Sequence, residues 1–327
     1  MGSNLYKFND ISLVGDKYLR DKFDKSQPVL IKIHFGESDN NSALFPKDIL
    51  PVTAWLKSEG FDIILSDTPV AYPSKRNTVE GYEKVAMDRG YGELGQIKIV
   101  DDYLPVEIAG NTYEVGRDYI ESKNVLVITH VKGDSCSGFC GAIKNWGMGG
   151  LSKDSKNFIH DGGSPLVNEE CIGCGICSSL CPEDAISLDS GVAVIDYDKC
   201  LGCSLCVMNC PYGAMESKSG VYFDELLAQG AAAVINSMKG TQIYINIINR
   251  VTNNCDCYFN SGDIIADDVG VLVGDNPVAI DYATVDLINE KSGSSIFEDT
   301  HSKSPYLHLD HAENLTHFSK EYSISEV

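Results

Sequence analysis

One short stretch, from Cys171 to Pro211, restricts what this chain can be more than any other. It contains CIGCGICSSLCP and, further on, CLGCSLCVMNCP, so the pattern Cys-x2-Cys-x2-Cys-x3-Cys-Pro occurs twice. Three cysteines at this interval let a tight loop turn its thiols toward one centre, and the fourth, before proline, leaves that loop. Gly173, Gly175 and Gly202 suit such loops because glycine takes backbone conformations that other residues avoid. The repetition argues against a chance arrangement.

This spacing is that of bacterial proteins with two iron–sulfur clusters, in which the fourth cysteine of each run binds the cluster of the other run. We therefore predict two [4Fe–4S] clusters in a ferredoxin-like unit. One is bound by Cys171, Cys174, Cys177 and Cys210, and the other by Cys200, Cys203, Cys206 and Cys181. The alternatives are zinc knuckles and disulfides, but zinc sites rarely use a third cysteine at this interval and a fourth before proline.

Composition limits the partners of the chain. Its 327 residues are 43% hydrophobic and 22% charged, which is typical of a soluble globular protein. The net charge of −21 argues against nucleic acid or an anionic membrane surface as the main partner. The charge supports solubility, and it also suits docking to a basic redox partner.

The cellular location follows from the N-terminus and the cysteines. The first 20 residues lack the apolar core of a signal peptide, and the longest nearly apolar run, 226–235, is too short to cross a bilayer. Thiolate-bound clusters also need a reducing compartment. We therefore expect a cytoplasmic protein of an anaerobe that does not bind the membrane.

Strand and helix patterns alternate on both sides of the cysteine-rich stretch. Apolar strand patterns cover 28–35, 61–69, 96–102, 124–134 and 241–251, and helical patterns cover 48–60, 77–95 and 221–239. Residues 267–290 indicate a strand, a turn and a helix. This alternation predicts an α/β fold, a mostly parallel sheet flanked by helices, with an inserted two-cluster ferredoxin-like (α+β) module. The predicted division is 1–165 and 218–327 for the α/β domain and 166–217 for the insert.

Polar residues follow several of the predicted strands. In parallel sheets ligands gather where strands end, so we take His34, His130 and Lys132 as candidate catalytic residues. The alternative is that each histidine is structural. Lys32, Arg76, Lys132 and Lys144 are candidates for an anion site, or they pair with nearby carboxylates.

Four cysteines lie outside the repeated pattern: Cys136, Cys140, Cys255 and Cys257. Cys-x3-Cys and Cys-x-Cys each follow an apolar strand and could converge on one metal, either a third iron–sulfur cluster or zinc. The alternative is two unrelated pairs of buried or reactive thiols.

Four further segments resemble one family: KIHFGE (32–37), SKRNTVEGY (74–82), HVKGDSCSGFCGAIKNWGMGG (130–150) and NCDCYFNSGDIIADDVGVLVGDNPVAIDYATVDL (254–287). The family is domain of unknown function 362, whose members often carry a two-cluster ferredoxin, and the resemblance covers about residues 28 to 310. It implies an iron–sulfur protein with an α/β domain and no particular reaction. The matching residues are His34, Glu37, Arg76, His130, Lys132, Lys144, Asn145, Cys255, Asp256 and Cys257. Cys140 stands where the family usually has a small residue, which favours a metal at the extra cysteines in this subgroup.

These observations predict an iron–sulfur redox protein that relays low-potential electrons through two [4Fe–4S] clusters to a site in the α/β domain. The extra cysteines would add a further metal or iron–sulfur centre there. A redox partner protein is implied, together with a small-molecule substrate if the chain is a reductase. The alternatives are a non-catalytic ferredoxin-type electron carrier, and a thiol or metal carrier that handles sulfur through Cys255 and Cys257.

Overall fold

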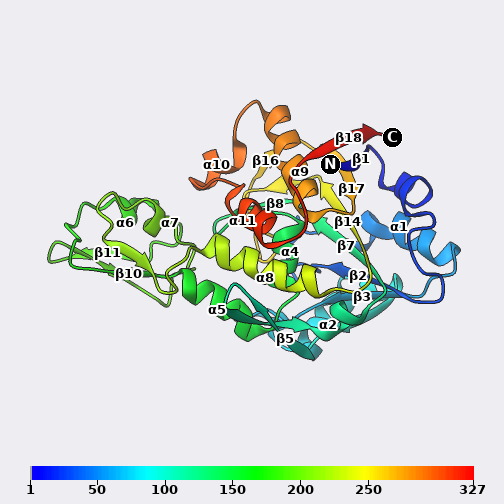
Figure 1. The fold of residues 1–327 in the computed structure, drawn as a ribbon, viewed down its shortest axis with the longest axis horizontal. Coiled ribbons are helices and arrows are strands. Elements are labelled where there is room, and N and C mark those ends of the chain that lie inside the picture. Colours follow the sequence, from blue (N-terminus) through cyan, green and yellow to red (C-terminus); the bar gives the residue numbers. More distant parts are fainter. Residues whose placement is uncertain (1) are drawn as a thin grey trace.

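An eight-stranded sheet in the order β18-β1-β17-β14-β7-β2-β3-β4 runs through the centre of the molecule (Figure 1). The structure is a computed structural model that describes residues 2–327. The strands of the sheet are β1 (Ser3–Phe8), β2 (Val29–Ile33), β3 (Ile63–Asp67), β4 (Gln96–Ile99), β7 (Asn124–His130), β14 (Thr241–Ile248), β17 (Gly270–Gly274) and β18 (Tyr322–Glu326).

Five neighbouring strands, from β14 to β4, are parallel, which confirms the predicted mostly parallel sheet. The strand β17 lies antiparallel between β14 and β1. The first and last strands, β1 and β18, pair in parallel, so the first and last strands of the described chain lie side by side at one edge of the sheet (Figure 1). The sequence patterns indicated neither β18 nor the reversed direction of β17.

Helices cover both faces of the sheet, as the alternating pattern predicts. They are α1 (Pro46–Ser58), α2 (Val79–Asp88), α3 (Arg117–Glu121), α4 (Ala142–Gly149), α5 (Lys153–Gly163), α8 (Phe223–Ser237), α9 (Pro277–Ser292), α10 (Ile296–His301) and α11 (Leu307–Leu315). Side chains alternate along β7: Val125 and Val127 join the core with α4 and α8, whereas Leu126 and Ile128 join the core with α1 and α2. Each face of the sheet therefore has its own buried core.

Three antiparallel pairs of short strands lie outside the main sheet in the α/β part of the chain. They are β5 (Tyr103–Ile108) with β6 (Asn111–Gly116), β8 (Lys132–Asp134) with β9 (Gly138–Cys140), and β15 (Val251–Thr252) with β16 (Ile264–Ala266). The glycine-rich stretch 136–165, which shows little periodicity in the sequence, contains β9, α4 and α5.

Residues 165–217 form a small unit that extends away from the sheet (Figure 1). It contains β10 (Pro165–Val167), α6 (Ile176–Leu180), β11 (Ile186–Asp189), β12 (Val192–Ile195), α7 (Leu205–Met208) and β13 (Met215–Ser217). The strands pair as β10 with β13 and β11 with β12, and the unit has a small core of its own. The chain leaves the sheet after β7 and returns at β14, the neighbouring strand, so this unit interrupts the sheet between adjacent strands.

The repeated cysteine pattern is also a repeat of backbone shape. Gly173 and Gly202, at equivalent positions, have φ of 66° and 68°, and Gly175 and Ser204 have φ of 82° and 61°. All four lie in the left-handed region that favours glycine. None of the helices within residues 2–327 combines the length and the apolar character that crossing a bilayer requires.

A buried carboxylate from α9 fixes the start of α4, the helix that follows the β8–β9 hairpin. The Asp281 carboxylate accepts hydrogen bonds from the backbone N–H of Ala142 and Ile143, both at 2.8 Å, and from the Asn246 side chain at 2.8 Å. A Cβ atom at Gly141 would lie 2.3 Å from Asp281 Oδ1, so only glycine allows this close approach. Because the first N–H groups of a helix have no partner within it, this contact satisfies them.

We expect Asp281→Ala to destabilise the folded chain by roughly 3 kcal/mol, because it leaves buried backbone N–H groups without an acceptor. The thermal midpoint measured by calorimetry at pH 8 should fall by roughly 5 °C. That pH lies above the value of about 6 to which burial raises the pKa of Asp281, so the wild-type carboxylate is charged. The control is Asp299→Ala, which removes an exposed carboxylate from α10. Equal midpoints for both variants would contradict this role.

Candidate functional site

Charged side chains gather where the parallel strands end. His34 follows β2, Asp67 ends β3 and His130 ends β7. The strand register aligns the ends of β2 and β7, because Ile33 pairs with Ile128. The loops beyond this edge contribute the remaining groups of the candidate site.

Three of these groups form a tight cluster of thiols and a carboxylate. Asp134 on β8, Cys140 on β9 and Cys255 in the loop between β15 and β16 have donor atoms within 4.8 Å of one another. The hairpin brings the first two together, and Asp134 Oδ2 lies 3.7 Å from Cys140 Sγ. The other oxygen, Oδ1, accepts backbone hydrogen bonds from Cys136 at 3.0 Å and Ser137 at 2.9 Å. One carboxylate oxygen is thus held by the hairpin, and the other faces the thiols.

The electrostatics of the cluster favour one thiolate. Hydrogen bonds from the Cys140 and Cys257 thiols, with the nearby Lys144 ammonium, hold the pKa of Cys255 well below its usual value despite burial. Burial and the Cys255 thiolate raise the pKa of Cys140. Burial would raise the pKa of Asp134 too, but Lys144, which forms an ion pair with it, brings that pKa below its usual value. The cluster is therefore a low-pKa thiol beside a paired carboxylate.

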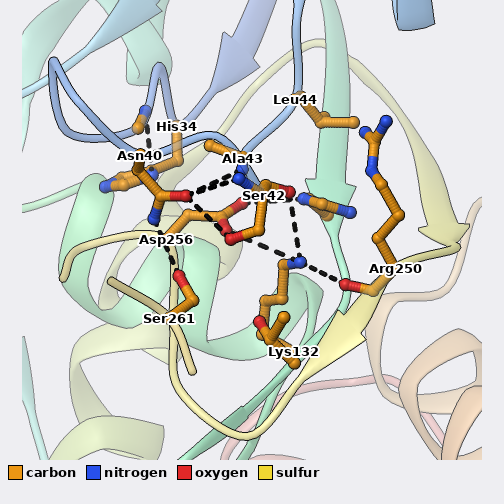
Figure 2. A network of polar contacts seen from close by, with 12 residues as sticks. His34, Asn40, Ser42, Ala43, Leu44, Lys132, Arg250, Asp256 and Ser261 are labelled. Atoms are coloured by element: carbon orange, nitrogen blue, oxygen red, sulfur yellow. Dashed lines mark hydrogen bonds and ion pairs between the residues drawn. The ribbon is translucent and has the colours of Figure 1, made fainter. Parts of the chain in front are cut away.

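The loop that carries Cys255 and Cys257 is fastened from several sides. Figure 2 shows Asn40 donating to Ser261 Oγ, at 2.7 Å, and accepting from Ser42. Asn40 also donates to the Tyr258 carbonyl at 2.8 Å, and the Tyr72 hydroxyl donates to the Cys257 carbonyl at 3.1 Å. These contacts hold the loop in place.

Two of the predicted catalytic residues hold the aspartate between the two cysteines. His130 Nδ1 lies 2.7 Å from Asp256 Oδ2, and its Nε2 lies 2.9 Å from the Asn249 carbonyl. Lys132 Nζ lies 3.7 Å from Asp256 Oδ1 and also donates to the carbonyls of Ser42 and Arg250 (Figure 2). In this geometry His130 and Lys132 position the loop, and their part in catalysis stays a prediction.

The third predicted catalytic residue, His34, contacts a buried ion pair. Arg76 donates to Glu37 Oε1 through Nε at 3.0 Å and Nη2 at 2.6 Å, and its Nη1 lies 2.7 Å from His34 Nε2. Burial and the Arg76 charge lower the pKa of His34 to about 4. His34 is therefore neutral near pH 7, and its two ring nitrogens face the N–H groups of Gly36 and Arg76.

The four cations considered for an anion site all face carboxylates. The pairs are Lys32 with Asp67 at 3.1 Å, Arg76 with Glu37 at 2.6 Å, Lys132 with Asp256 at 3.7 Å, and Lys144 with Asp134. A fifth buried cation, Lys156, donates to Thr68 Oγ1 at 2.7 Å, and burial lowers its pKa to about 7. For Lys32, Arg76, Lys132 and Lys144 the geometry therefore shows the alternative, pairing with nearby carboxylates.

The eight cysteines of the repeated pattern line two separate hollows in the 165–217 unit. One hollow is lined by Cys171, Cys174, Cys177 and Cys210, and the other by Cys181, Cys200, Cys203 and Cys206. Several of these sulfurs accept backbone hydrogen bonds at 3.3–3.4 Å, from Ala193 to Cys171, Ala185 to Cys181, Gly202 to Cys200 and Ala214 to Cys210.

A buried lysine joins the loop of the second hollow to the α/β domain. Lys303 Nζ donates to the Cys203 carbonyl at 2.8 Å and to the Cys136 carbonyl at 2.5 Å, and it pairs with Asp224 at 2.7 Å. The same loop is held by Ser204, whose hydroxyl donates to the Gly163 carbonyl at 2.8 Å. The loop of the first hollow is more open, since Cys174 is exposed.

Three of the four additional cysteines lie together, and the fourth lies apart from them. Cys140, Cys255 and Cys257 lie together, whereas Cys136 is buried between the thiol cluster and the Cys203 loop, bound to Asp134 by its N–H and to Lys303 by its carbonyl. Burial raises the pKa of Cys136.

Comparison with known proteins settles the family. The sequence profile described as Domain of unknown function (DUF362) matches residues 29–286. The chain belongs to this family. That confirms the resemblance seen in the sequence, and the DUF362 match spans the residues before and after the cysteine-rich unit.

The comparison with solved structures finds two weak similarities. A structural-genomics crystal structure of a Thermotoga maritima protein matches with a TM-score of 0.41 at 9% identity, covering 72% of this chain and 50% of that one. The lactate racemase apoprotein from Thermoanaerobacterium thermosaccharolyticum matches with a TM-score of 0.36 at 11% identity, covering 76% and 51%. The chain spans about half the length of each of these two proteins. No curated protein matches the chain.

Several residues of this site were not singled out from the sequence. Asp134 lies inside the segment 130–150 that resembles the family but is not among its predicted site residues, and Asn40, Asp224 and Lys303 carry no motif. Lys303 lies 100 residues from the Cys203 carbonyl that it binds, so no local pattern could reveal it.

We expect Arg76→Met to lower the thermal midpoint clearly, because it leaves the Glu37 carboxylate buried without its cation, at a cost of roughly 3–5 kcal/mol. Calorimetry measures the effect. The double variant Glu37→Gln/Arg76→Met should recover part of the loss, since no unpaired charge remains. A double variant less stable than Arg76→Met would show that the ion pair is not the cause.

Proposed function

We propose that this protein is an iron–sulfur redox protein that passes low-potential electrons through two [4Fe–4S] clusters to the thiol and carboxylate site of its α/β domain. One observation carries the proposal: the eight cysteines line two hollows, and each hollow holds the four that the ferredoxin spacing assigns to one cluster. Each hollow combines three cysteines of one run with the fourth of the other.

The residues present fit such clusters. Four thiols surround each hollow, and backbone N–H groups point at sulfurs that would carry negative charge as cluster ligands. Hydrogen bonds to cluster sulfurs are one of the means by which a protein sets the reduction potential. The left-handed positions at Gly173 and Gly202 occur in both loops at the same place. When bound, the clusters would supply one-electron transfer.

The position of the two hollows gives the relay a direction. The hollow with Cys174 is the outer one, since this cysteine is exposed and its neighbour Ile172 is 61% exposed. The hollow with Cys203 is the inner one, since Lys303 joins its loop to Cys136 and so to Asp134. Electrons would enter at the outer hollow from a partner protein and leave at the inner hollow toward the α/β domain.

The partner would be a redox protein with a basic surface, because acidic residues far outnumber basic ones in 166–217. In this proposal residues 1–165 and 218–327 form one α/β domain, and residues 166–217 are its ferredoxin-like insert. A reduced cluster pair implies the cytoplasm of an anaerobe. A small-molecule substrate at the α/β site would make the protein a reductase.

A second function has one observation in its favour. The low pKa of Cys255 beside Cys257 suits a thiol or sulfur carrier, because the thiolate is the reactive form. The contacts of Lys303 with the Cys203 and Cys136 carbonyls favour the relay instead, since a sulfur carrier does not require a link between the two parts of the molecule.

Paired cysteine variants test the crossed assignment of ligands. Anaerobically purified wild type should contain about eight irons per chain. Cys171→Ala/Cys210→Ala removes two ligands of the outer hollow and should leave about four, whereas Cys171→Ala/Cys181→Ala removes one from each and should leave almost none. Iron and acid-labile sulfide analysis measures this. The reverse order of the two double variants would show that each run binds its own cluster.

Lys303→Met tests the connection between the two parts. Loss of a buried cation beside the Cys203 loop should make the reduction potential of the inner cluster more negative, because less positive charge then stabilises the reduced cluster. A redox titration followed by electron paramagnetic resonance should show one potential shifted and the other unchanged. The control is Lys320→Met, a surface lysine paired with Asp310. Two unchanged potentials at full iron content would contradict the role of Lys303.

A further inference from the structure

We infer that Asp134, Cys140 and Cys255 bind one thiophilic divalent metal ion, Zn²⁺ or Fe²⁺, as a mononuclear centre separate from the two clusters. The inference goes beyond the proposed relay and does not depend on it. It also differs from the sequence prediction, in which Cys136, Cys140, Cys255 and Cys257 were the candidate ligands of a third cluster or zinc.

The size of the group decides between a single ion and a third cluster. The three donor atoms lie within 4.8 Å of one another. Two thiolates bound at about 2.3 Å to one tetrahedral ion lie about 3.8 Å apart, so small side-chain movements would complete the site. In a [4Fe–4S] cube each thiolate binds a different corner iron, which keeps the sulfurs much further apart. A compact set of donors therefore suits one ion.

The charges of the buried group also balance around a divalent ion. Two thiolates and one carboxylate carry three negative charges, and the ion together with the Lys144 ammonium, paired with Asp134, supplies three positive ones. Buried charge is stable only when it is paired in this way. Thiolates with a carboxylate are a donor set that zinc and ferrous iron accept.

The ligands are held in place by the surrounding chain. Asp134 Oδ1 is fixed by the N–H groups of Cys136 and Ser137, so Oδ2 is the oxygen that faces Cys140. The carbonyl of Cys255 accepts from Ser261 Oγ at 3.1 Å, and Asn40 holds that serine (Figure 2). Such outer contacts orient metal ligands and raise the affinity of a site.

Three protein ligands leave a fourth position. This is the arrangement of catalytic metal sites, in which the open position takes water or substrate. Cys257 contacts Cys255 but falls outside the set of three. Cys136 lies outside it as well, with its backbone bound to Asp134 and Lys303, which makes it the matched control.

The test measures metal on the full chain, purified anaerobically with its clusters. Zinc and iron are counted together, and the expected result is one ion beyond the cluster iron: about one zinc with about eight irons, or about nine irons without zinc. Cys255→Ala and Cys140→Ser should each lose that one ion and keep about eight irons, which also shows that they fold. Cys136→Ala should keep it. For a zinc-containing sample, X-ray absorption at the zinc edge should show sulfur at about 2.3 Å with oxygen at about 2.0–2.2 Å.

Four results would overturn the inference. They are eight irons without zinc, about twelve irons with about four lost in Cys255→Ala, an extra ion retained in both ligand variants (an adventitious ion only), or its loss in Cys136→Ala alone. Failure of the relay is distinguishable, because wild-type iron well below eight contradicts the two clusters, whereas the presence or loss of the extra ion is scored separately.

Discussion

The carboxylate of Asp134 is the contact on which the candidate site depends. One of its oxygens closes the β8–β9 turn by accepting the N–H groups of Cys136 and Ser137, and the other faces Cys140 and pairs with Lys144. The residue therefore belongs both to the hairpin and to the thiol cluster. Without it, two buried amides and a half-buried ammonium would have no acceptor, and an unpaired buried group costs about 1–3 kcal/mol.

Buried polar pairs surround the rest of this region. The Arg76–Glu37 ion pair and the His130–Asp256 hydrogen bond come from different strand ends, and the Glu37 N–H donates to the Asp256 carbonyl at 3.2 Å, which joins the two pairs. Buried pairs contribute little net stability compared with apolar packing, so their concentration here is better explained by positioning than by stability. They hold the Cys255 loop against the sheet.

The two halves of the 165–217 unit are alike in sequence but differ in their surroundings. Ser204 occupies the left-handed position that Gly175 occupies in the other half. A residue other than glycine is strained there, and Ser204 is compensated because its hydroxyl donates to Gly163 and accepts from the Phe223 N–H at 2.9 Å. The half that carries Ser204 lies against the α/β domain, and the half that carries Gly175 faces solvent. A duplicated unit thus acquires an inner and an outer end.

The sequence by itself determined the family, the mostly parallel sheet and the flanking helices, because these follow from local periodicity and from motifs that are contiguous in the chain. It also grouped Cys140, Cys255 and Cys257 as candidate metal ligands, together with Cys136. Only the tertiary structure decided that Asp134 lies with the thiols, that Cys136 lies on the path to Lys303, and that β17 runs antiparallel. The reason is that these arrangements rest on contacts between residues far apart in the chain, such as the 100-residue separation of Lys303 from Cys203, and on the burial that forces charges to pair.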